Sequence, residues 1–224
     1  MLRRSTIGIT ALLLLILAAA PAEADVLGVG DSTSLASLMG SQADIFVIGD
    51  KQFDLFTYAP TDLSPIPDEV TVTGTELNGM PGLQINGFWA AETGQAFDWA
   101  LGYRVQVIEG NAMISDIHLS ADFIKVGTGL GIISETVRDG SGNIVASAFV
   151  STAGPSNAMA YLDPYLSVAY IKKDLGLRGG SNGLASFSIV DQYISQNVPE
   201  PSSLLLMGIV MAGAGLVVRR RGQS

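Results

Sequence analysis

The sequence predicts an all-β fold, a single antiparallel β-sandwich. Short segments in which apolar and polar residues alternate recur at regular spacing between residues 25 and 197, as expected for half-buried strands. Turn residues separate these segments, and helical periodicity is almost absent. There is no repeat of roughly 20–50 residues, which argues against a solenoid or a propeller. We therefore expect about nine or ten strands, in a jelly-roll or an immunoglobulin-like arrangement.

The predicted strands follow one another from residue 45 to residue 194. The clearest hairpin joins Ile132–Arg138 to Asn143–Val150 through Asp139-Gly140-Ser141-Gly142, a sequence that suits a tight turn. The longest strand is residues 95–109, with one apolar face formed by Phe97, Trp99, Leu101, Tyr103, Val105 and Val107. The other predicted strands are residues 45–48, 51–58, 69–73, 83–89, 113–123, 165–171 and 185–194. Ahead of them, residues 34–39 predict a short helix.

The N-terminus has the pattern of a secretory signal peptide. A basic start at residues 1–4 precedes an apolar run at residues 7–20. Ala22 and Ala24 then supply the small residues that a signal peptidase requires, so we expect residues 1–24 to be removed by cleavage before Asp25. The pair Arg3-Arg4 raises twin-arginine export as an alternative. The residues that follow lack the longer consensus, which favours general secretion.

The C-terminus, residues 198–224, combines three features in a fixed order. Pro199-Glu200-Pro201 precedes an uncharged segment of 17 residues, 202–218, which is followed by Arg219, Arg220 and Arg221. At about 1.5 Å per residue a helix of this length measures roughly 25 Å, near the lower limit for crossing a bilayer. The arginines then mark the cytoplasmic end. A buried core helix is the alternative, but such a helix would show a polar face and would not end in three arginines.

This tail resembles the PEP-CTERM sorting tail of bacterial envelope proteins. The resemblance rests on Pro199, Glu200, Pro201 and Arg219 to Arg221. It implies recognition by an exosortase, removal of the tail near Pro-Glu-Pro, and a bacterium with an outer membrane that exports exopolysaccharide. The body is similar to uncharacterised secreted PEP-CTERM proteins of bacteria, which suggests one domain and no particular activity. The residues that carry this second likeness are Gly49 to Lys51, Phe53, Phe56, Leu83 to Trp89, Tyr103, Ile114 to Asp116, Asp191 and Gln192.

We therefore expect a β-sandwich body at residues 25–197 that acts outside the cytoplasm. The tail would hold it briefly at the inner membrane before release to the cell surface or the extracellular matrix. Residues 25–201 contain 20 of the 21 acidic residues and only seven basic ones, a formal charge of −13. Such a surface repels nucleic acid, which excludes that class of partner. There is no cysteine, so disulfides and thiol chemistry are excluded as well.

Little in the body points to catalysis. His118 is the only histidine, and its alternation with Ile117 and Leu119 predicts a position on the solvated face. No nucleophile elbow, phosphate loop or zinc signature is present. Asp139, Ser141 and Asn143 have the spacing that begins a calcium loop, but a hairpin turn explains them equally well. We assign no catalytic residue and no cofactor. Calcium bound by surface carboxylates remains an alternative without assigned residues.

Two further groups of residues have either a binding or catalytic role or an ordinary structural one. Some carboxylates could form a glycosidase pair, but we expect them to be ordinary solvated acids. They are Asp98, Glu109, Asp116, Asp122 and Glu135. Aromatic residues on strands usually fill the core, as Trp99 is expected to do. Trp89 and Tyr161 lie near predicted loop ends and are the candidates for stacking against a sugar.

These observations favour a non-enzymatic exported protein with a structural or adhesive role in the envelope or exopolysaccharide matrix. A carbohydrate-binding sandwich is the first alternative, and it requires exposed aromatic side chains on one face. A glycan-active hydrolase is the second alternative, and it requires two carboxylates that face each other in a cleft, one with a raised pKa.

Overall fold

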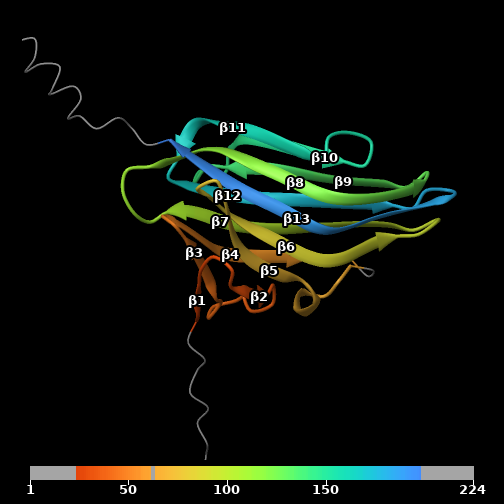
Figure 1. Ribbon diagram of the computed structural model, residues 1–224, viewed down its shortest axis with the longest axis horizontal. Coiled ribbons are helices and arrows are strands. Elements are labelled where there is room, and N and C mark those ends of the chain that lie inside the picture. Colours follow the sequence, from red (N-terminus) through yellow and green to blue (C-terminus); the bar gives the residue numbers. More distant parts are fainter. Residues whose placement is uncertain (1–23, 62–63, 198–224) are drawn as a thin grey trace, which may run out of the picture.

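Two sheets packed face to face make up the part of the chain described by the computed structural model, residues 24–61 and 64–197 (Figure 1). The seven-stranded sheet has the order β1-β3-β4-β7-β12-β9-β10, and the six-stranded sheet has the order β11-β8-β13-β6-β5-β2. The predicted β-sandwich is confirmed. The elements are β1 (Val26–Leu27), β2 (Ser32–Ser34), β3 (Ile45–Ile48), β4 (Lys51–Ala59), the 3-10 helix η1 (Pro67–Glu69), β5 (Thr71–Leu77), β6 (Met80–Ala91), β7 (Ala96–Val107), β8 (Met113–Gly127), β9 (Leu130–Arg138), β10 (Ile144–Ser151), β11 (Asn157–Leu166), β12 (Val168–Arg178) and β13 (Gly183–Asn197).

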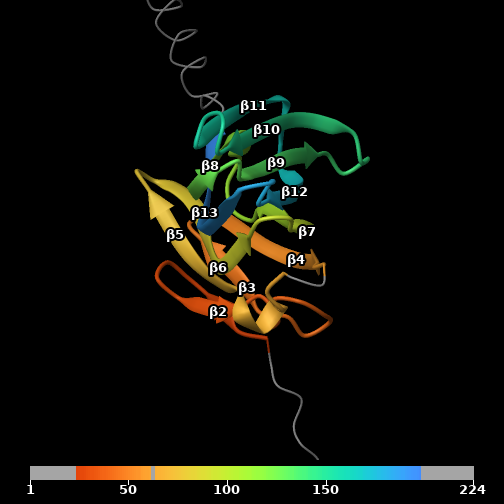
Figure 2. The same cartoon turned by 90° about the vertical axis from the view of Figure 1, so that its right-hand side faces the viewer.

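Strands β6 to β13 trace a jelly roll. Their order is β6-β13-β8-β11 in one sheet and β7-β12-β9-β10 in the other, so the chain crosses between sheets at every connection except the β9–β10 hairpin. Of the two expected topologies, the structure therefore has the jelly roll. The earlier strands extend it, because β4 pairs with β7 and β5 pairs with β6. Figure 2 shows the two sheets as separate layers, with β10 and β11 adjacent at one end.

The core lies between the sheets and is rich in aromatic side chains. Along β7 the predicted apolar face is buried, from Phe97 to Val105. Trp99 stacks on Trp89 of β6, with ring centroids 4.8 Å apart and an angle of 10° between the planes. Phe187 of β13 completes the stack, 4.9 Å from Trp89. Because these rings come from strands of both sheets, the stack fixes the distance between the layers.

Several details differ from the sequence prediction. The described residues contain thirteen strands, and the three that were missed are β1, β2 and β11. The first two have only two and three residues, too few to show an alternating pattern. One pair, β1 with β3, is parallel rather than antiparallel. The predicted helix at residues 34–39 is absent: Ser34 ends β2 and residues 35–38 form turns, held by bonds such as Leu38 N–H to Leu35 O at 3.2 Å.

The predicted targeting segments lie almost wholly outside the described residues. Of the expected signal peptide and its cleavage site, Ala22 lies outside, whereas Ala24 and Asp25 are described and exposed. Pro199, Glu200, Pro201 and the arginines at residues 219–221 all lie outside. Among residues 24–61 and 64–197, no helix is long and apolar enough to cross a membrane.

Candidate functional site

The outer face of the six-stranded sheet carries polar side chains in register. Gln84 of β6, Asp191 of β13, Ser120 of β8 and Asn157 of β11 lie opposite one another across four neighbouring strands. Side chains alternate between the two faces of a sheet, and these four all point to the outer face. Gln84 Nε2 donates to Asp191 Oδ1 at 2.9 Å. The row therefore presents amide, carboxylate and hydroxyl groups side by side.

A second row runs parallel to the first and is more apolar. It contains Tyr193 of β13, His118 of β8 and Met159 of β11. On the same face Tyr161 lies two residues beyond Met159 and is 69% exposed. The expectation that Tyr161 is accessible is confirmed.

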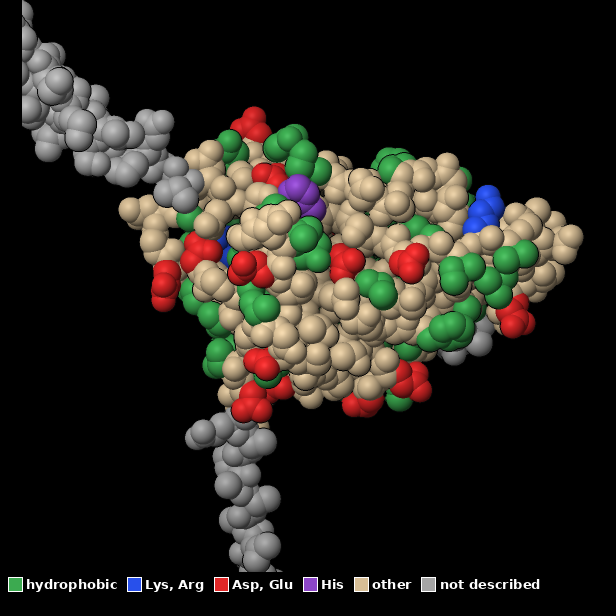
Figure 3. All heavy atoms as spheres, in the orientation of Figure 1, with side chains coloured by type: hydrophobic (Ala, Val, Ile, Leu, Met, Phe, Trp, Pro, Cys, Tyr) green, Lys and Arg blue, Asp and Glu red, His purple; other side chains and the backbone are tan. Residues whose placement is uncertain are grey.

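Two adjoining hollows follow these rows. The larger, of about 530 Å³, is lined by residues that include Asp122, Asp191 and the loop at 151–156. The smaller, of about 290 Å³, lies over His118, Met159 and Tyr193. Ser120 and Asn157 line both hollows, which therefore adjoin. We call them together the outer-face trough. Figure 3 shows this face, with the histidine beside hydrophobic side chains and with far more acidic than basic groups.

Trp89 is buried, contrary to our expectation that it is exposed near a loop end. It is 2% exposed, because β6 continues to Ala91 and its odd-numbered positions point into the core. The neighbouring Phe88 faces outward and is 77% exposed. The error came from ending the strand at residue 89, since the alternation itself places Trp89 beside Ile85 in the core.

His118 lies on the outer face, as predicted, and contacts a serine and an aspartate, the residue types of a catalytic triad. Its Nε2 atom is 3.0 Å from Ser195 Oγ and 2.8 Å from Asp116 Oδ1. A catalytic triad requires the serine and the acid on different ring nitrogens, so that the acid can orient the base. Here both contacts involve one nitrogen, and Ser195 Oγ also lies 3.2 Å from Met80 Sδ. This arrangement does not activate a nucleophile.

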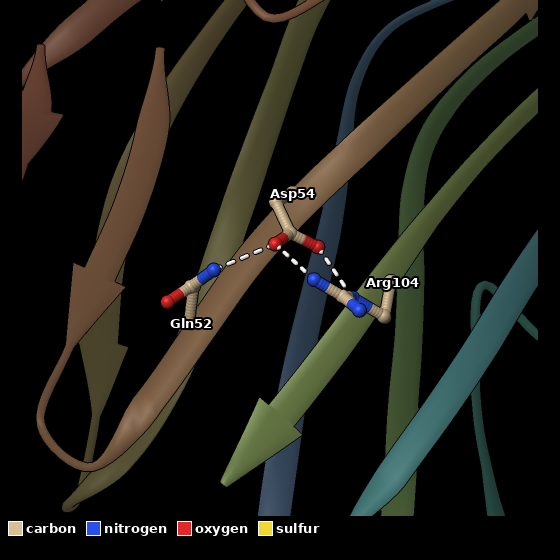
Figure 4. Close-up of polar contacts among 3 residues, drawn as sticks. All are labelled: Gln52, Asp54 and Arg104. Atoms are coloured by element: carbon tan, nitrogen blue, oxygen red, sulfur yellow. Dashed lines mark hydrogen bonds and ion pairs between the residues drawn. The ribbon is translucent and has the colours of Figure 1, made fainter. Parts of the chain in front are cut away.

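On the outer face of the seven-stranded sheet, the main charged groups are Arg104 and Asp54, which hydrogen-bond to each other. Arg104 Nε and Nη2 donate to the two carboxylate oxygens of Asp54 at 2.8 and 2.6 Å. Gln52 Nε2 also donates to Asp54, at 2.6 Å (Figure 4). The hydrogen bonds to Asp54 raise the pKa of Arg104. A β-bulge follows in β4, where the exposed Leu55 adopts a φ of 53°.

Two carboxylates do face each other on this second face. Asp98 of β7 and Asp174 of β12 line a hollow of about 280 Å³. Burial, and after it the charge of Asp98, raises the pKa of Asp174. Asp98 was among the predicted carboxylates, whereas Asp174 was not. Both side chains are exposed.

The remaining candidate carboxylates have other surroundings. Glu109 and Asp122 are exposed, and Glu135 is fully buried against Lys173. Asp139 organises the predicted hairpin turn, because its side chain accepts from Ser141 N–H, Asn143 N–H and Asn143 Nδ2. Within the described residues, no group of three or more His, Cys, Asp or Glu side chains could hold a metal ion.

Sequence reasoning missed two fully buried lysines, Lys51 and Lys173. Lys173 occupies an inward position of β12, in line with Ile171 and Leu175. A lysine in an apolar register is the signal that could have revealed it, because an unpaired charge is rarely buried.

The fold and the outer-face trough define a jelly-roll sandwich with an open polar surface on one sheet. The chain also carries a PEP-CTERM protein-sorting motif, which a family model matches at residues 197–221. The predicted resemblance of the tail to the PEP-CTERM sorting tail is thus confirmed. The motif implies export, C-terminal anchoring in a membrane and processing by an exosortase. A search of curated proteins found no match, so the likeness of the body to secreted PEP-CTERM proteins stays a prediction.

Solved structures share only a distant likeness with the chain. TmCBM61 in complex with beta-1,4-galactotriose is 14% identical, with a TM-score of 0.32 over 62% of this chain and 88% of that one. The Gap123 complex of Streptococcus agalactiae is 10% identical, with a TM-score of 0.31 over 62% and 26%. Tailspike protein 4 of bacteriophage CBA120 is 18% identical, with a TM-score of 0.27 over 62% and 19%. None of these likenesses bears on what this chain binds.

Proposed function

We propose that the protein is an exported surface protein that adheres to uncharged polysaccharide through the outer-face trough. The observation that carries the proposal is the row of Gln84, Asp191, Ser120 and Asn157, with the exposed ring of Tyr161 four residues farther along β11 on the same face. Sugars offer closely spaced hydroxyl groups that amides and carboxylates can bind, and apolar ring faces that stack on aromatic side chains.

The charge of the protein selects among polysaccharides. Residues 25–201 have a formal charge of −13, and the larger hollow of the trough contains two acids, Asp122 and Asp191, against one base, Lys125. Anionic polysaccharides would therefore be repelled, whereas neutral ones would not.

The route to this site of action is part of the proposal. A signal peptidase would cleave before Asp25, and an exosortase would cut near Pro199 to Pro201 after a transient stay in the inner membrane. The body would then reach the cell surface or the extracellular matrix of a bacterium with an outer membrane. There it would hold exopolysaccharide without modifying it, so the proposed role is adhesive rather than enzymatic.

Binding of purified full chain to neutral β-galactan, cellulose and polygalacturonate tests the proposal. We expect binding to a neutral polymer and none to polygalacturonate. Tyr161→Ala and Asp191→Asn should each weaken binding about tenfold or more, as for residues that dominate an interface. Phe88→Ala is the matched control, because Phe88 is an exposed aromatic residue of the same sheet but lies on β6, three strands away from Tyr161 on β11. Equal loss in Phe88→Ala, or no binding to any neutral polymer, would contradict the proposal.

A glycan hydrolase is a second candidate, favoured by the facing carboxylates of Asp98 and Asp174. The raised pKa of Asp174 is the property that a general acid requires. We place hydrolysis behind binding because both side chains are open to solvent, where neighbouring charges are well screened. Release of reducing ends in the same mixtures, lost in Asp174→Asn, would instead favour hydrolysis.

A further inference from the structure

Three polar side chains meet in the core between the two sheets. Lys173 of β12, Glu135 of β9 and Gln192 of β13 are each 0% exposed. Lys173 Nζ contacts both Glu135 Oε2 and Gln192 Oε1. An amine, a carboxylate and a carboxamide are thus held together away from water.

The surroundings of Lys173 favour its uncharged form. Burial lowers the pKa of Lys173, although the adjacent Glu135 opposes the shift. Tyr103 is also buried near Glu135, and its pKa is raised by burial and then by the charge of Glu135. A charge pair in such a site has a large desolvation cost, which transfer of one proton from lysine to glutamate removes. The product of that transfer is a neutral amine, which is a nucleophile.

With Lys173 and Glu135 as a simple ion pair, two polar atoms of the cluster have no hydrogen bond. Among the described residues, neither Glu135 Oε1 nor Gln192 Nε2 has a hydrogen-bond partner. A buried donor or acceptor without a partner costs free energy that a folded protein normally avoids. The unpaired group on Gln192 is its amide nitrogen, the atom that an attack on the carboxamide would expel.

We propose that Lys173 and Gln192 become joined by an isopeptide bond, with Glu135 carrying the protons. Glu135 first takes one proton from the lysine ammonium. Nζ then attacks Cδ of Gln192, which lies one carbonyl bond, about 1.2 Å, beyond the oxygen that it contacts. The proton that Nζ loses passes through Glu135 to Nε2, which departs as ammonia. The Nζ–Cδ bond forms, the Cδ–Nε2 bond breaks, and no oxidant or cofactor is needed.

The product suits the site better than the starting groups. A neutral amide and a protonated carboxyl group replace a buried charge pair, and the unpaired Gln192 nitrogen is gone. The new bond would join β12 of the seven-stranded sheet to β13 of the six-stranded sheet, which share no backbone ladder. An exported protein without cysteine would thereby gain a covalent tie between its layers, a role that disulfides often have outside the cytoplasm.

A second lysine provides an internal comparison. Lys51 is also 0% exposed, and its Nζ contacts Asp50 Oδ1 at 2.6 Å and Gln196 Oε1. The chemical groups are the same, but the Asp50 side chain is 22% exposed. Water at this carboxylate stabilises the charged pair, so we expect Lys51 to remain unmodified.

Peptide mapping of the full-length chain tests the bond directly. Trypsin cleaves after Lys172, Lys173 and Arg178, and the next basic residue is Arg219. A modified Lys173 resists cleavage. We therefore expect a branched peptide that joins residues 173–178 to the peptide beginning at Gly179, lighter than the sum of its parts by one ammonia. A wild-type digest with a free Lys173 and no branched peptide would overturn the proposal.

Matched variants separate the roles of the three residues. Lys173→Met and Glu135→Gln should both abolish the branched peptide, the first by removing the nucleophile and the second by removing the proton carrier. Lys51→Met should leave it intact. Formation of the branched peptide in Glu135→Gln would overturn the assignment of Glu135. Its loss in Lys51→Met would overturn the assignment of the reaction to the fully buried triad.

Discussion

At the scale of single residues, Asp139 gives the clearest dependence of stability on pH. Its hydrogen bonds with Asn143 and Ser141 lower its pKa in the folded protein. A lowered folded pKa means that Asp139 stabilises the fold above its unfolded pKa, about 3.9, and that this stability is lost as the pH falls through the folded pKa. Asp139→Ala should therefore lower the urea midpoint at pH 7 and have a smaller effect near pH 2.

The control for this prediction is Asp139→Asn. Asparagine keeps a side-chain oxygen that can accept from the backbone of Ser141 and Asn143, but it cannot titrate. Its urea midpoint should lie between those of the wild type and Asp139→Ala at pH 7. An Asp139→Ala effect of equal size at both pH values would show that the carboxylate charge is not involved.

The same scale shows what the sequence could indicate about the site. The exposure of Tyr161 follows from its place near a predicted loop, but the prediction for Trp89 is wrong because β6 continues past it to Ala91. Gln84, Asp191, Ser120 and Asn157 come from four different strands, and no local pattern joins them. Only the register of the sheet makes them neighbours.

At the scale of elements, Gly82 holds two strands of the six-stranded sheet at close approach. A Cβ atom at this position would lie 2.2 Å from Gln192 O and 2.6 Å from the Tyr193 ring. Gly82→Ala must therefore push β6 away from β13, and we expect it to lower the free energy of unfolding by about 1–3 kcal/mol. Urea unfolding followed by tryptophan fluorescence measures the change.

Gly176 in β12 is the matched control for Gly82. It is also a strand glycine without a positive φ, but the nearest heavy atom to an added Cβ is Phe97 O at 4.0 Å. Gly176→Ala should change the free energy of unfolding by less than about 0.5 kcal/mol. Similar losses in both variants would mean that a general cost of replacing strand glycines, and not close approach, explains the effect at Gly82.

Most strands were predictable because half-buried strands alternate, and β7 does so with few exceptions. The missed strand β11 lacks this signal, since it lies at the edge of its sheet and many of its residues are exposed. The turns at residues 35–38 look helical in sequence because Leu35 and Leu38 are both apolar, and both are buried. Their spacing of three residues fits a turn as well as a helix.

At the scale of the whole molecule, the jelly roll could be named only as one of two topologies. Its defining pairs join strands far apart in sequence, such as β6 with β13 and β7 with β12. Alternation shows which face of a strand is buried but not which strand lies beside it. The charge distribution, in contrast, follows directly from the sequence once the targeting segments are set aside.

The last strand decides where the folded unit ends. β13 pairs with β6 on one side and β8 on the other, and its residues Gln192 and Ile194 are fully buried. We therefore expect residues 25–197 alone to fold with the urea midpoint of the full chain. Residues 25–190 should not fold, because this fragment lacks residues 191–197, the half of β13 that holds Gln192 and Ile194 between β6 and β8. Circular dichroism and urea unfolding of both fragments measure this. A fragment 25–197 that fails to fold, or a fragment 25–190 that folds, would contradict the domain boundary at residue 197.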